Sequence, residues 1–170
     1  MIRKIVISAA GLGTRLLPIT KEIPKEMMPL FLRDKNNGVV VKPLIQIIFE
    51  QFFQQGLREY CIIVGRQKRI IQDHFMIDEE FLKKFEKKSE YKQDLKKFYS
   101  MLNKSKIFWA KQSEPKGFGD AVKYSESFVG NDDFLVIAGD TLIPKGGKII
   151  KKLMNAKLKG KNDAILLLKE

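Results

Sequence analysis

A glycine-rich turn near the N-terminus carries the residues best suited to bind phosphate. It contains Gly11, Gly13 and Arg15. Glycines let backbone N–H groups approach an anion closely, and a guanidinium offers a planar, permanently charged fork for phosphate oxygens. The spacing matches neither a Walker A sequence nor a dinucleotide-binding fingerprint. The turn therefore predicts a phosphate site, with an ordinary structural turn as the alternative interpretation.

Two further polar clusters contain residues that could complete a nucleotide site. Gln112 offers both a donor and an acceptor, as recognition of a base edge requires, and Gly117 would let a flat base lie against the backbone. Asp140 supplies a carboxylate, and magnesium is commonly held by one or two carboxylates together with substrate phosphates. Taken singly, each cluster is also compatible with a plain loop or turn.

The elements that must position these clusters alternate between strand and helix. Apolar runs predict strands over residues 4–8, 60–64, 107–110, 134–138 and 164–168. Helical spacing and Pro/Gly signals predict helices over residues 43–53, 70–75, 79–103 with a break near Ser89, 121–128 and 148–158. Residues 33–38 read as an exposed turn. This alternation predicts an open, mostly parallel α/β sheet with helices on both faces.

The three clusters share one position relative to the predicted sheet. Each begins just after a predicted strand, and ligands of open α/β sheets bind beyond the carboxyl ends of the strands. We therefore expect the loops that contain Gly11, Gln112 and Asp140 to face a single ligand. Their expected convergence is stronger evidence than any one cluster.

Composition favours one globular domain over residues 1–170. Hydrophobic residues make up 44% and charged residues 31% of the chain, which is typical of a globular protein. No apolar run approaches the roughly 18–20 residues that span a bilayer, and the N-terminus does not resemble a signal peptide, so we expect a cytoplasmic protein without a membrane partner. Cys61 lies in an apolar run and is expected to be a buried structural thiol. His74 has no catalytic partner in sequence and is expected to be structural.

The formal net charge of +12 concerns partners more than fold. Much of the excess lies in a Lys-rich stretch between residues 83 and 106 that has apolar residues on the opposite helical face. A solvated amphipathic helix explains the pattern. A nucleic-acid-binding face is the alternative, but no recognised binding motif accompanies it.

At this point the residues resemble the UTP–glucose-1-phosphate uridylyltransferases of the bacterial and archaeal type, within the sugar-1-phosphate nucleotidyltransferases. The opening motif AAGLGTRLLP spans residues 9–18 and is followed by Thr20, Lys21 and PKEM at 24–27. The match continues through KPLIQ at 42–46, DHF at 73–75, Gln112 with PKGFGDA at 115–121, and Gly139 with Asp140. The later motifs favour uridylyl over thymidylyl transfer, and a thymidylyltransferase for the same sugar phosphate is the alternative.

The resemblance implies a Rossmann-like fold and a role for each matching residue. Ala10, Gly11 and Gly13 would line the nucleoside and phosphates, Arg15 would hold pyrophosphate, and Lys25 would neutralise charge near the reacting phosphoryl group. Gln112 and Gly117 would recognise uracil, and Asp140 would bind Mg²⁺. The implied reaction is in-line attack of glucose 1-phosphate on the α-phosphorus of UTP, which gives UDP-glucose and pyrophosphate.

Family members run well beyond the length of this chain, and their later portion supplies a second metal carboxylate and most of the sugar pocket. We therefore expect residues 1–170 to be the N-terminal part of a longer nucleotidyltransferase domain, incomplete at the C-terminus. A chain that binds nucleotide without turnover is the alternative. The predicted last strand would leave an exposed edge and apolar surface, which a homo-oligomer could cover.

Overall fold

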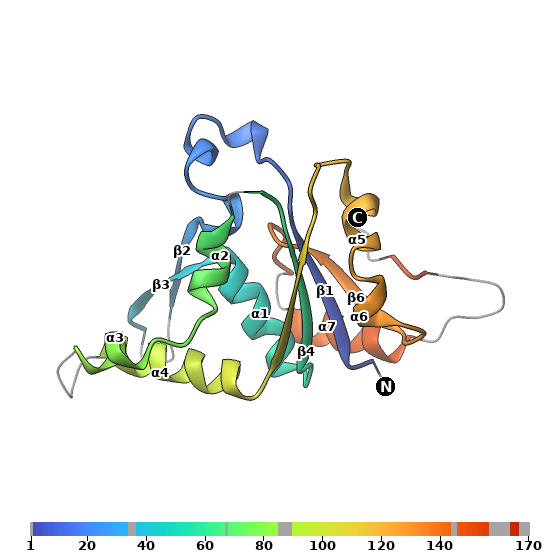
Figure 1. The fold of residues 1–170 in the computed structure, drawn as a ribbon. Helices are drawn as coiled ribbons and strands as arrows, with labels where there is room; N and C mark the ends of the chain where they lie inside the picture. The colour runs from blue at the N-terminus through green and yellow to red at the C-terminus, as the bar shows by residue number, and fades with distance from the viewer. Residues whose placement is uncertain are drawn as a thin grey trace.

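A four-stranded parallel sheet forms the centre of the computed structural model, which describes residues 2–33, 37–66, 68–84, 90–143, 146–156 and 164–166. Its strands are β1 (Lys4–Ala9), β4 (Glu59–Val64), β5 (Lys106–Lys111) and β6 (Phe134–Ala138). The order across the sheet is β5-β4-β1-β6, and every neighbouring pair is parallel (Figure 1). The predicted parallel α/β fold is confirmed.

β1 lies inside the sheet and is covered on both faces. Ile5, Val6 and Ile7 are completely buried. Successive side chains of a strand point to opposite faces. Accordingly, Ile5 and Ile7 belong to one core cluster and Val6 to the other. This two-sided burial explains why the strand reads as an unbroken apolar run.

Helices cover both faces, as predicted. The larger core packs under α1 (Leu44–Gln54), α2 (Arg69–His74), α4 (Glu90–Asn103) and α7 (Gly146–Asn155). The smaller core lies under α5 (Phe118–Lys123) and α6 (Glu126–Val129). Figure 1 shows α5 and α6 on one side of the sheet and α1 and α2 on the other.

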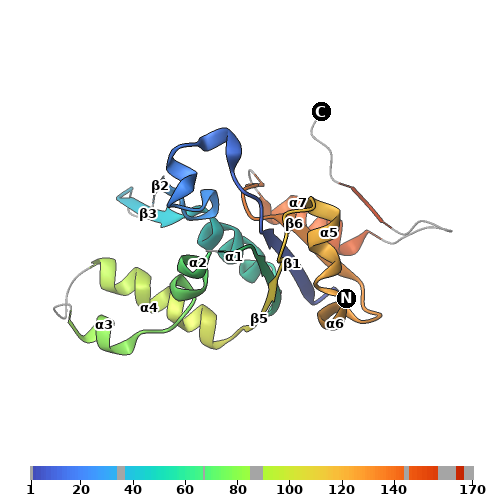
Figure 2. The same ribbon diagram turned by 45° about the horizontal axis from the view of Figure 1, so that its top comes forward.

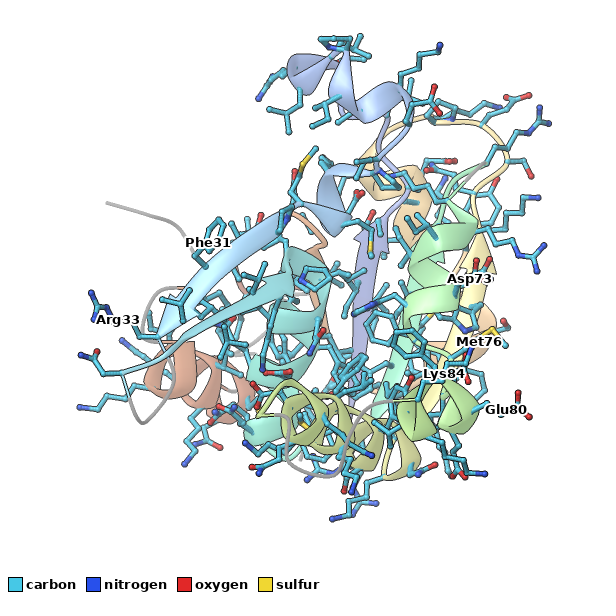
Figure 3. The ribbon with its side chains drawn as sticks, turned by 90° about the vertical axis from the view of Figure 1, so that its left-hand side faces the viewer. Phe31, Arg33, Asp73, Met76, Glu80 and Lys84 are labelled. Atoms are coloured by element: carbon cyan, nitrogen blue, oxygen red, sulfur yellow. The ribbon has the colours of Figure 1, made fainter. Side chains whose placement is uncertain are left out.

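An antiparallel ribbon of two strands, β2 (Pro29–Arg33) and β3 (Val39–Pro43), was not predicted from the sequence. The predicted turn at residues 33–38 falls between these strands, with residues 34–36 outside the described residues, and Arg33 Nη1 donates to Asn37 Oδ1 at 2.7 Å. Figure 2 shows the ribbon beside the segment that follows β1. In Figure 3, Phe31 and Arg33 lie on the ribbon, away from Asp73 and Met76. The ribbon connects the segment that follows the glycine-rich turn to α1.

Several predicted boundaries were wrong. Pro43 ends β3 and caps α1 instead of lying within its first turn. The predicted helix over residues 121–128 begins earlier, at Phe118, and is split into α5 and α6. The predicted helix over 148–158 starts at Gly146 and ends at Asn155. The Lys-rich stretch forms α3 (Glu79–Lys83) and α4, while Ser89 and the predicted break lie outside the described residues.

The predicted strand over residues 164–168 was also wrong where it can be compared. Ala164, Ile165 and Leu166 belong to no strand, and Leu167 and Leu168 lie outside the described residues. An apolar run becomes a strand only when a neighbouring strand satisfies its N–H and C=O groups, and the described residues provide none beside it. Within the described part of the chain, no helix is long and apolar enough to cross a membrane.

Candidate nucleotide-binding site

The loops that follow the four parallel strands meet at one edge of the sheet. β1 and β4 are in register up to Ala9 and Val64, and β1 and β6 up to Ser8 and Ala138. Beyond these pairs, Gly139 N donates to Ser8 O at 2.8 Å, and Gln112 N donates to Val64 O at 2.9 Å. The predicted convergence of the three clusters at one edge is therefore confirmed.

The strand order reverses between β1 and β6, because the chain places β4 and β5 on one side of β1 and then returns to the other side. Such a switch point opens a crevice outside the carboxyl ends of the two strands. The loop after β1 contains Gly11 and Gly13, and the loop after β6 contains Asp140. Two of the predicted clusters therefore flank this crevice.

The glycine loop, defined as residues 10–15, has a backbone that requires glycine at one position. Gly13 has φ +68°, in the left-handed region that favours glycine. A Cβ there would also lie 3.0 Å from Thr20 Cγ2, while Thr20 Oγ1 donates to Gly13 O at 2.8 Å. Arg15 follows on the short helix η1 (Thr14–Leu16) with its side chain exposed. The glycine loop is thus held in a turned conformation that leaves Arg15 available to a ligand.

Lys25 and Asp140 form an ion pair across the switch point. Lys25 Nζ lies 2.6 Å from Asp140 Oδ2, and both side chains are partly exposed. Lys25 begins the short helix η3 (Lys25–Met27). A Cβ on Gly11 would lie 3.4 Å from Lys25 Nζ, so the ammonium is close to the glycine loop as well. Three of the predicted site residues, Gly11 and Lys25 from the β1–β2 connection and Asp140 from the loop after β6, are therefore neighbours.

The described residues contain no group of three or more His, Cys, Asp or Glu side chains that could enclose a metal ion. These residues therefore do not by themselves provide a complete set of protein ligands for a cation. Magnesium usually retains several waters and binds through one or two carboxylates plus substrate phosphates. The partly exposed carboxylate of Asp140 beside the glycine loop fits that mode of binding.

Gln112 is only 4% exposed, and its amide is oriented by the protein. Its Nε2 donates to Asp120 Oδ2 at 2.7 Å and lies 3.3 Å from Gly117 O. An ionised carboxylate can only accept hydrogen bonds, so Asp120 fixes which end of the amide is Nε2. Gly117 has φ +104°, which also favours glycine. The donor side of the predicted base-reading amide is therefore occupied, and Oε1 is the atom that could accept from a base.

Two charged residues beneath the glycine loop were missed. Glu26 is 0% and Lys68 9% exposed, and they form an ion pair of 2.9 Å. Glu26 belongs to the PKEM motif at residues 24–27. Lys68 lies shortly after β4, just as each predicted cluster lies shortly after its strand. The position of Lys68 after a strand was a usable signal. The burial of the pair was not, because charged residues are rarely buried.

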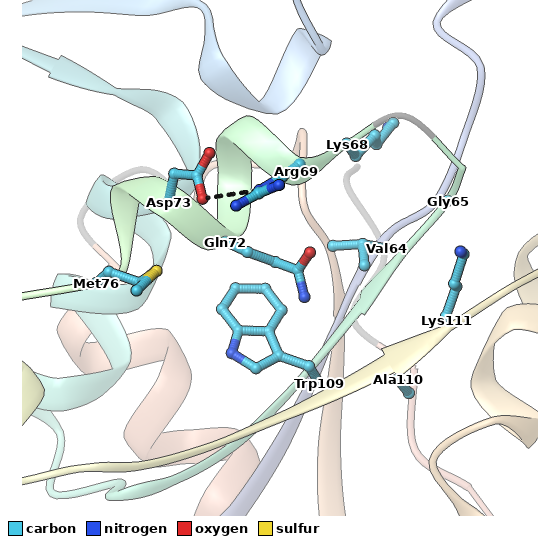
Figure 4. A pocket seen from close by; sticks show the side chains of 10 residues that line it. All are labelled: Val64, Gly65, Lys68, Arg69, Gln72, Asp73, Met76, Trp109, Ala110 and Lys111. Carbon is cyan, nitrogen blue, oxygen red and sulfur yellow. Dashed lines mark ion pairs between the residues drawn. The ribbon is translucent and has the colours of Figure 1, made fainter.

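A cavity of about 490 Å³ lies on the other side of Lys68, between α2 and β5. Among the described residues it is lined by Val64, Gly65, Lys68, Arg69, Gln72, Asp73, Met76, Trp109, Ala110 and Lys111 (Figure 4). Arg69 and Asp73 form an exposed ion pair of 3.5 Å at its rim. None of the predicted site residues lines it. Lys68 therefore separates this cavity from the glycine loop.

His74 and Cys61 have the structural surroundings predicted for them. His74 Nε2 lies 2.9 Å from Gln46 Oε1, and its ring stacks on Phe98. Burial lowers the pKa of His74 to about 4. Burial also raises the pKa of the Cys61 thiol to about 11. The contacts of His74 described above do not include a residue of the glycine loop.

The Lys-rich stretch shows the amphipathic packing predicted for it. Phe98 and Leu102 of α4 are buried in the larger core, while Lys96 and Lys97 are exposed. The solvated-helix interpretation accounts for this arrangement.

Comparisons with known proteins identify close likenesses. A profile of the family described as nucleotidyl transferase matches residues 4–169. UTP–glucose-1-phosphate uridylyltransferase of Streptococcus pneumoniae is 39% identical over 158 residues, which cover 91% of this chain and 49% of that protein. These findings confirm the resemblance inferred from the motifs.

Solved structures agree with the sequence relatives. UDP-glucose pyrophosphorylase complexed with UDP-glucose is 35% identical with a TM-score of 0.66, over 82% of this chain and 46% of that one. UTP-bound UGPase from Acinetobacter baumannii is 27% identical with a TM-score of 0.69, over 92% of this chain and 54% of that one. The chain spans about half the length of these relatives.

Proposed function

This chain belongs to the nucleotidyl transferase family, and we propose that it supplies the UTP-binding part of an enzyme that makes UDP-glucose and pyrophosphate from UTP and glucose 1-phosphate. The names of its relatives motivate the choice of substrates. The cytoplasm is the proposed location, where a free thiol such as Cys61 stays reduced.

The observation that carries this proposal is the contact between Lys25 and Asp140 beside the glycine loop. A cation and a carboxylate from separate loops meet where a flavodoxin-like or Rossmann-like sheet binds its ligand. A triphosphate with its metal ion carries negative charge on the phosphates and positive charge on the metal. The Lys25 ammonium suits the phosphates, and the Asp140 carboxylate suits the metal ion. A purely structural ion pair would not need a neighbouring glycine turn with a left-handed residue.

In the proposed complex the protein holds the nucleotide at both ends. Ala10, Gly11 and Gly13 bind the nucleoside and phosphates, and Gln112 and Gly117 bind uracil. Gln112 Oε1 accepts from the imide N–H of the base, since Nε2 is held by Asp120. Arg15 binds the departing pyrophosphate, where a permanently charged fork suits several phosphate oxygens.

Asp140 is the residue proposed to hold Mg²⁺. The ion, when bound, would neutralise phosphate charge and polarise the reacting phosphoryl group. Lys25 would then turn from the Asp140 carboxylate toward the phosphate oxygens, a change that the partial exposure of both side chains permits. Protein groups would thus supply positioning and charge stabilisation without a covalent intermediate.

The reaction balances as a direct displacement. A phosphate oxygen of glucose 1-phosphate forms a bond to the α-phosphorus of UTP, while the bond from that phosphorus to the bridging oxygen of the β-phosphate breaks. The electron pair leaves with pyrophosphate. No side-chain nucleophile is required.

A second candidate is nucleotide binding without turnover by these 170 residues. The observation that favours it is that the relatives have about twice the length of this chain. Calorimetry with UTP, dTTP and ATP, with and without Mg²⁺, run beside a pyrophosphate-release assay, separates the candidates. Sustained release with glucose 1-phosphate supports the enzyme, and binding without release supports the second candidate.

The same experiment tests the base and the site. UTP should bind more tightly than ATP, and a preference for dTTP over UTP would indicate a thymidylyltransferase. Arg15→Ala should weaken UTP binding about tenfold or more, as expected for a lost charge-assisted contact. An absence of any nucleotide binding by the folded chain would overturn the proposed function.

A further inference from the structure

We propose that Lys68, with Glu26 as its partner, is a positioning residue that sets the peptide orientations of the glycine loop for phosphate binding. The binding part of this inference rests on the proposed function. The structural part, that Lys68 orders the loop, can be tested without a nucleotide.

Lys68 Nζ is surrounded by acceptors from two parts of the segment between β1 and β2, its start and η3. It donates to Ala9 O at 2.7 Å and Gly11 O at 2.7 Å. It also contacts Glu26 Oε1 at 3.0 Å and Oε2 at 2.9 Å. An ammonium has three N–H donors, and two carbonyls and one carboxylate use all of them. The ammonium therefore has its hydrogen bonds satisfied inside the protein and is not left to bind a ligand.

This arrangement determines which way the loop amides point. In a planar trans peptide the C=O and the following N–H point in opposite directions. Because Lys68 holds the carbonyls of Ala9 and Gly11, the N–H groups of Ala10 and Leu12 point away from Lys68. A cradle for phosphate needs N–H groups presented together on one side. Lys68 thus selects the loop conformation in which the amides do not face the core.

Glu26 connects the same pair to the Lys25–Asp140 contact. It follows Lys25 in η3 and is completely buried. A Cβ on Gly139 would lie 3.2 Å from Glu26 Cγ, so Glu26 packs against the residue that precedes Asp140. The buried pair therefore touches the loop after β1, the segment of Lys25 and the loop after β6. One contact thus relates the glycine loop, Lys25 and Asp140, the phosphate-binding part of the proposed site, to each other.

A general contribution to stability is the competing explanation, and energetics do not favour it. Burying two charges incurs a desolvation penalty that often exceeds their attraction. Burial lowers the pKa of Lys68, and the neighbouring Glu26 opposes that shift. Such a pair is weak evidence of added stability. Its position under the glycine loop is the feature that a purely stabilising pair would not require.

The chain offers a matched control at the opposite edge of the sheet. Lys4 Nζ donates to Phe128 O at 2.8 Å and Val129 O at 3.0 Å, and it pairs with Asp132 at 2.7 Å. Lys4 therefore makes the same kinds of contact, two carbonyls and a carboxylate, away from the glycine loop. Lys68→Met and Lys4→Met each remove one ammonium of this kind.

Amide hydrogen exchange of the nucleotide-free protein, at temperatures that give the variants equal global stability, is the first measurement. Lys68→Met should speed exchange of the amides of residues 10–16 about tenfold or more relative to Lys4→Met, since local opening no longer breaks the two hydrogen bonds from Lys68 to Ala9 O and Gly11 O. Equal exchange in the two variants would overturn the proposal, whatever the protein binds.

UTP calorimetry on the same samples is the second measurement. Lys68→Met should weaken UTP binding about tenfold or more, and Lys4→Met should leave it unchanged. If wild-type protein binds no nucleotide, the proposed function fails while the exchange result still decides the role of Lys68. If Lys68→Met binds UTP like the wild type, the proposal fails while the proposed function stands.

A double variant guards against misfolding of Lys68→Met. Glu26→Leu combined with Lys68→Met replaces the buried pair by apolar side chains, which proteins often tolerate without loss of stability. We expect this variant to fold, to keep fast exchange at residues 10–16 and to bind UTP weakly. Recovery of slow exchange together with wild-type affinity would show that the pair serves packing alone and would overturn the proposal.

Discussion

Asp140 is the residue at which two partners compete. Its carboxylate lies 2.6 Å from Lys25 Nζ, and the same carboxylate is the proposed Mg²⁺ ligand. A cation that binds there must share or displace the ammonium. If Asp140 is the Mg²⁺ ligand, as proposed, we expect this competition to make the affinity for Mg²⁺ alone weak, so that the metal binds together with the triphosphate, whose oxygens provide further ligands.

Asp140→Asn tests this arrangement. The substitution removes the charge of the proposed metal ligand but keeps its size, so Mg²⁺ should no longer improve UTP binding, a loss of about tenfold or more in the metal-dependent affinity. Calorimetry with and without Mg²⁺ measures it. Asp132→Asn, which removes an exposed carboxylate paired with Lys4 at the other edge, is the control. An unchanged metal dependence in Asp140→Asn would contradict the assignment.

His74 belongs to a polar chain that packs α2 against α1. Gln46 Nε2 donates to Glu50 Oε1 at 2.8 Å, and Glu50 also pairs with Lys42. Gln46 therefore presents Oε1 to His74, whose Nε2 carries the hydrogen. Gln46 of the KPLIQ motif and His74 of the DHF motif are thus explained by packing and not by the proposed site.

His74 gives a pH dependence with a definite sign. Its pKa is about 4 in the folded protein and near 6.5 when unfolded, because burial disfavours the charged ring. Between these values the unfolded chain binds a proton that the folded protein does not. The contribution to stability is therefore complete above pH 6.5 and lost as pH falls toward 4, by on the order of 3 kcal/mol.

Urea unfolding of wild type and His74→Gln at several pH values between 7.5 and 4 isolates this contribution. Carboxylates titrate in both proteins, so the difference between the two curves is the relevant quantity. We expect the free energy of unfolding to fall less steeply in the variant. Parallel curves would show that His74 titrates normally.

At the scale of elements, the glycine loop depends on a backbone conformation as much as on side chains. Gly13 is left-handed and close to Thr20, which binds its carbonyl. The glycine loop leaves β1 and ends in η1, and the chain then continues through η3 to the β2–β3 ribbon. Thr20 binds the loop at Gly13, while Lys68 binds the start of the loop at Ala9 and Gly11.

Gly13→Ala tests the loop as an element. A side chain in the left-handed region costs roughly 1–2 kcal/mol, and here it would also crowd Thr20, so both stability and UTP affinity should fall. Gly56→Ala is the control, because Gly56 has φ +96° and open space around its Cβ position at the end of α1. It should lower stability by a similar amount, measured by urea unfolding, with UTP affinity unchanged. Equal affinity losses in the two variants would indicate a general effect of destabilisation.

For the whole molecule, the parallel sheet is the unit that must stay intact to hold the loops together. Cys61 lies in β4, is 1% exposed and faces the smaller core under α5 and α6. Its thiol has a pKa raised by burial to about 11. A reagent can reach it only when the sheet opens, so its reactivity reports on the entire core.

Thiol modification by a disulfide reagent should therefore follow global unfolding. At pH 8 we expect the native protein to react at least ~10³-fold more slowly than the unfolded chain, given typical unfolding free energies of about 5–15 kcal/mol. The rate should rise with urea in parallel with the loss of helical signal. Fast reaction without urea would reveal local opening of β4.

The sequence predicted the fold well where a pattern is local. Periodicity identified β1, β4, β5, β6 and most helices, since burial on one or two faces leaves a repeating signature. The β2–β3 ribbon was missed although two apolar runs flank a turn, a recognised hairpin signal. Ala164 to Leu166 carried the apolar signal without the neighbour that a strand requires.

The sequence by itself determined which residue types stand after each strand, and therefore that Gly11, Gln112 and Asp140 would share one edge. The homo-oligomer, the single domain and the residue roles stay predictions. Only the tertiary structure decided that Lys25 meets Asp140 and that Lys68 and Glu26 are buried together under the glycine loop. The reason is physical: strand order and register fix which edge a loop occupies, whereas pairing of charges from distant segments depends on the packed arrangement of all three loops.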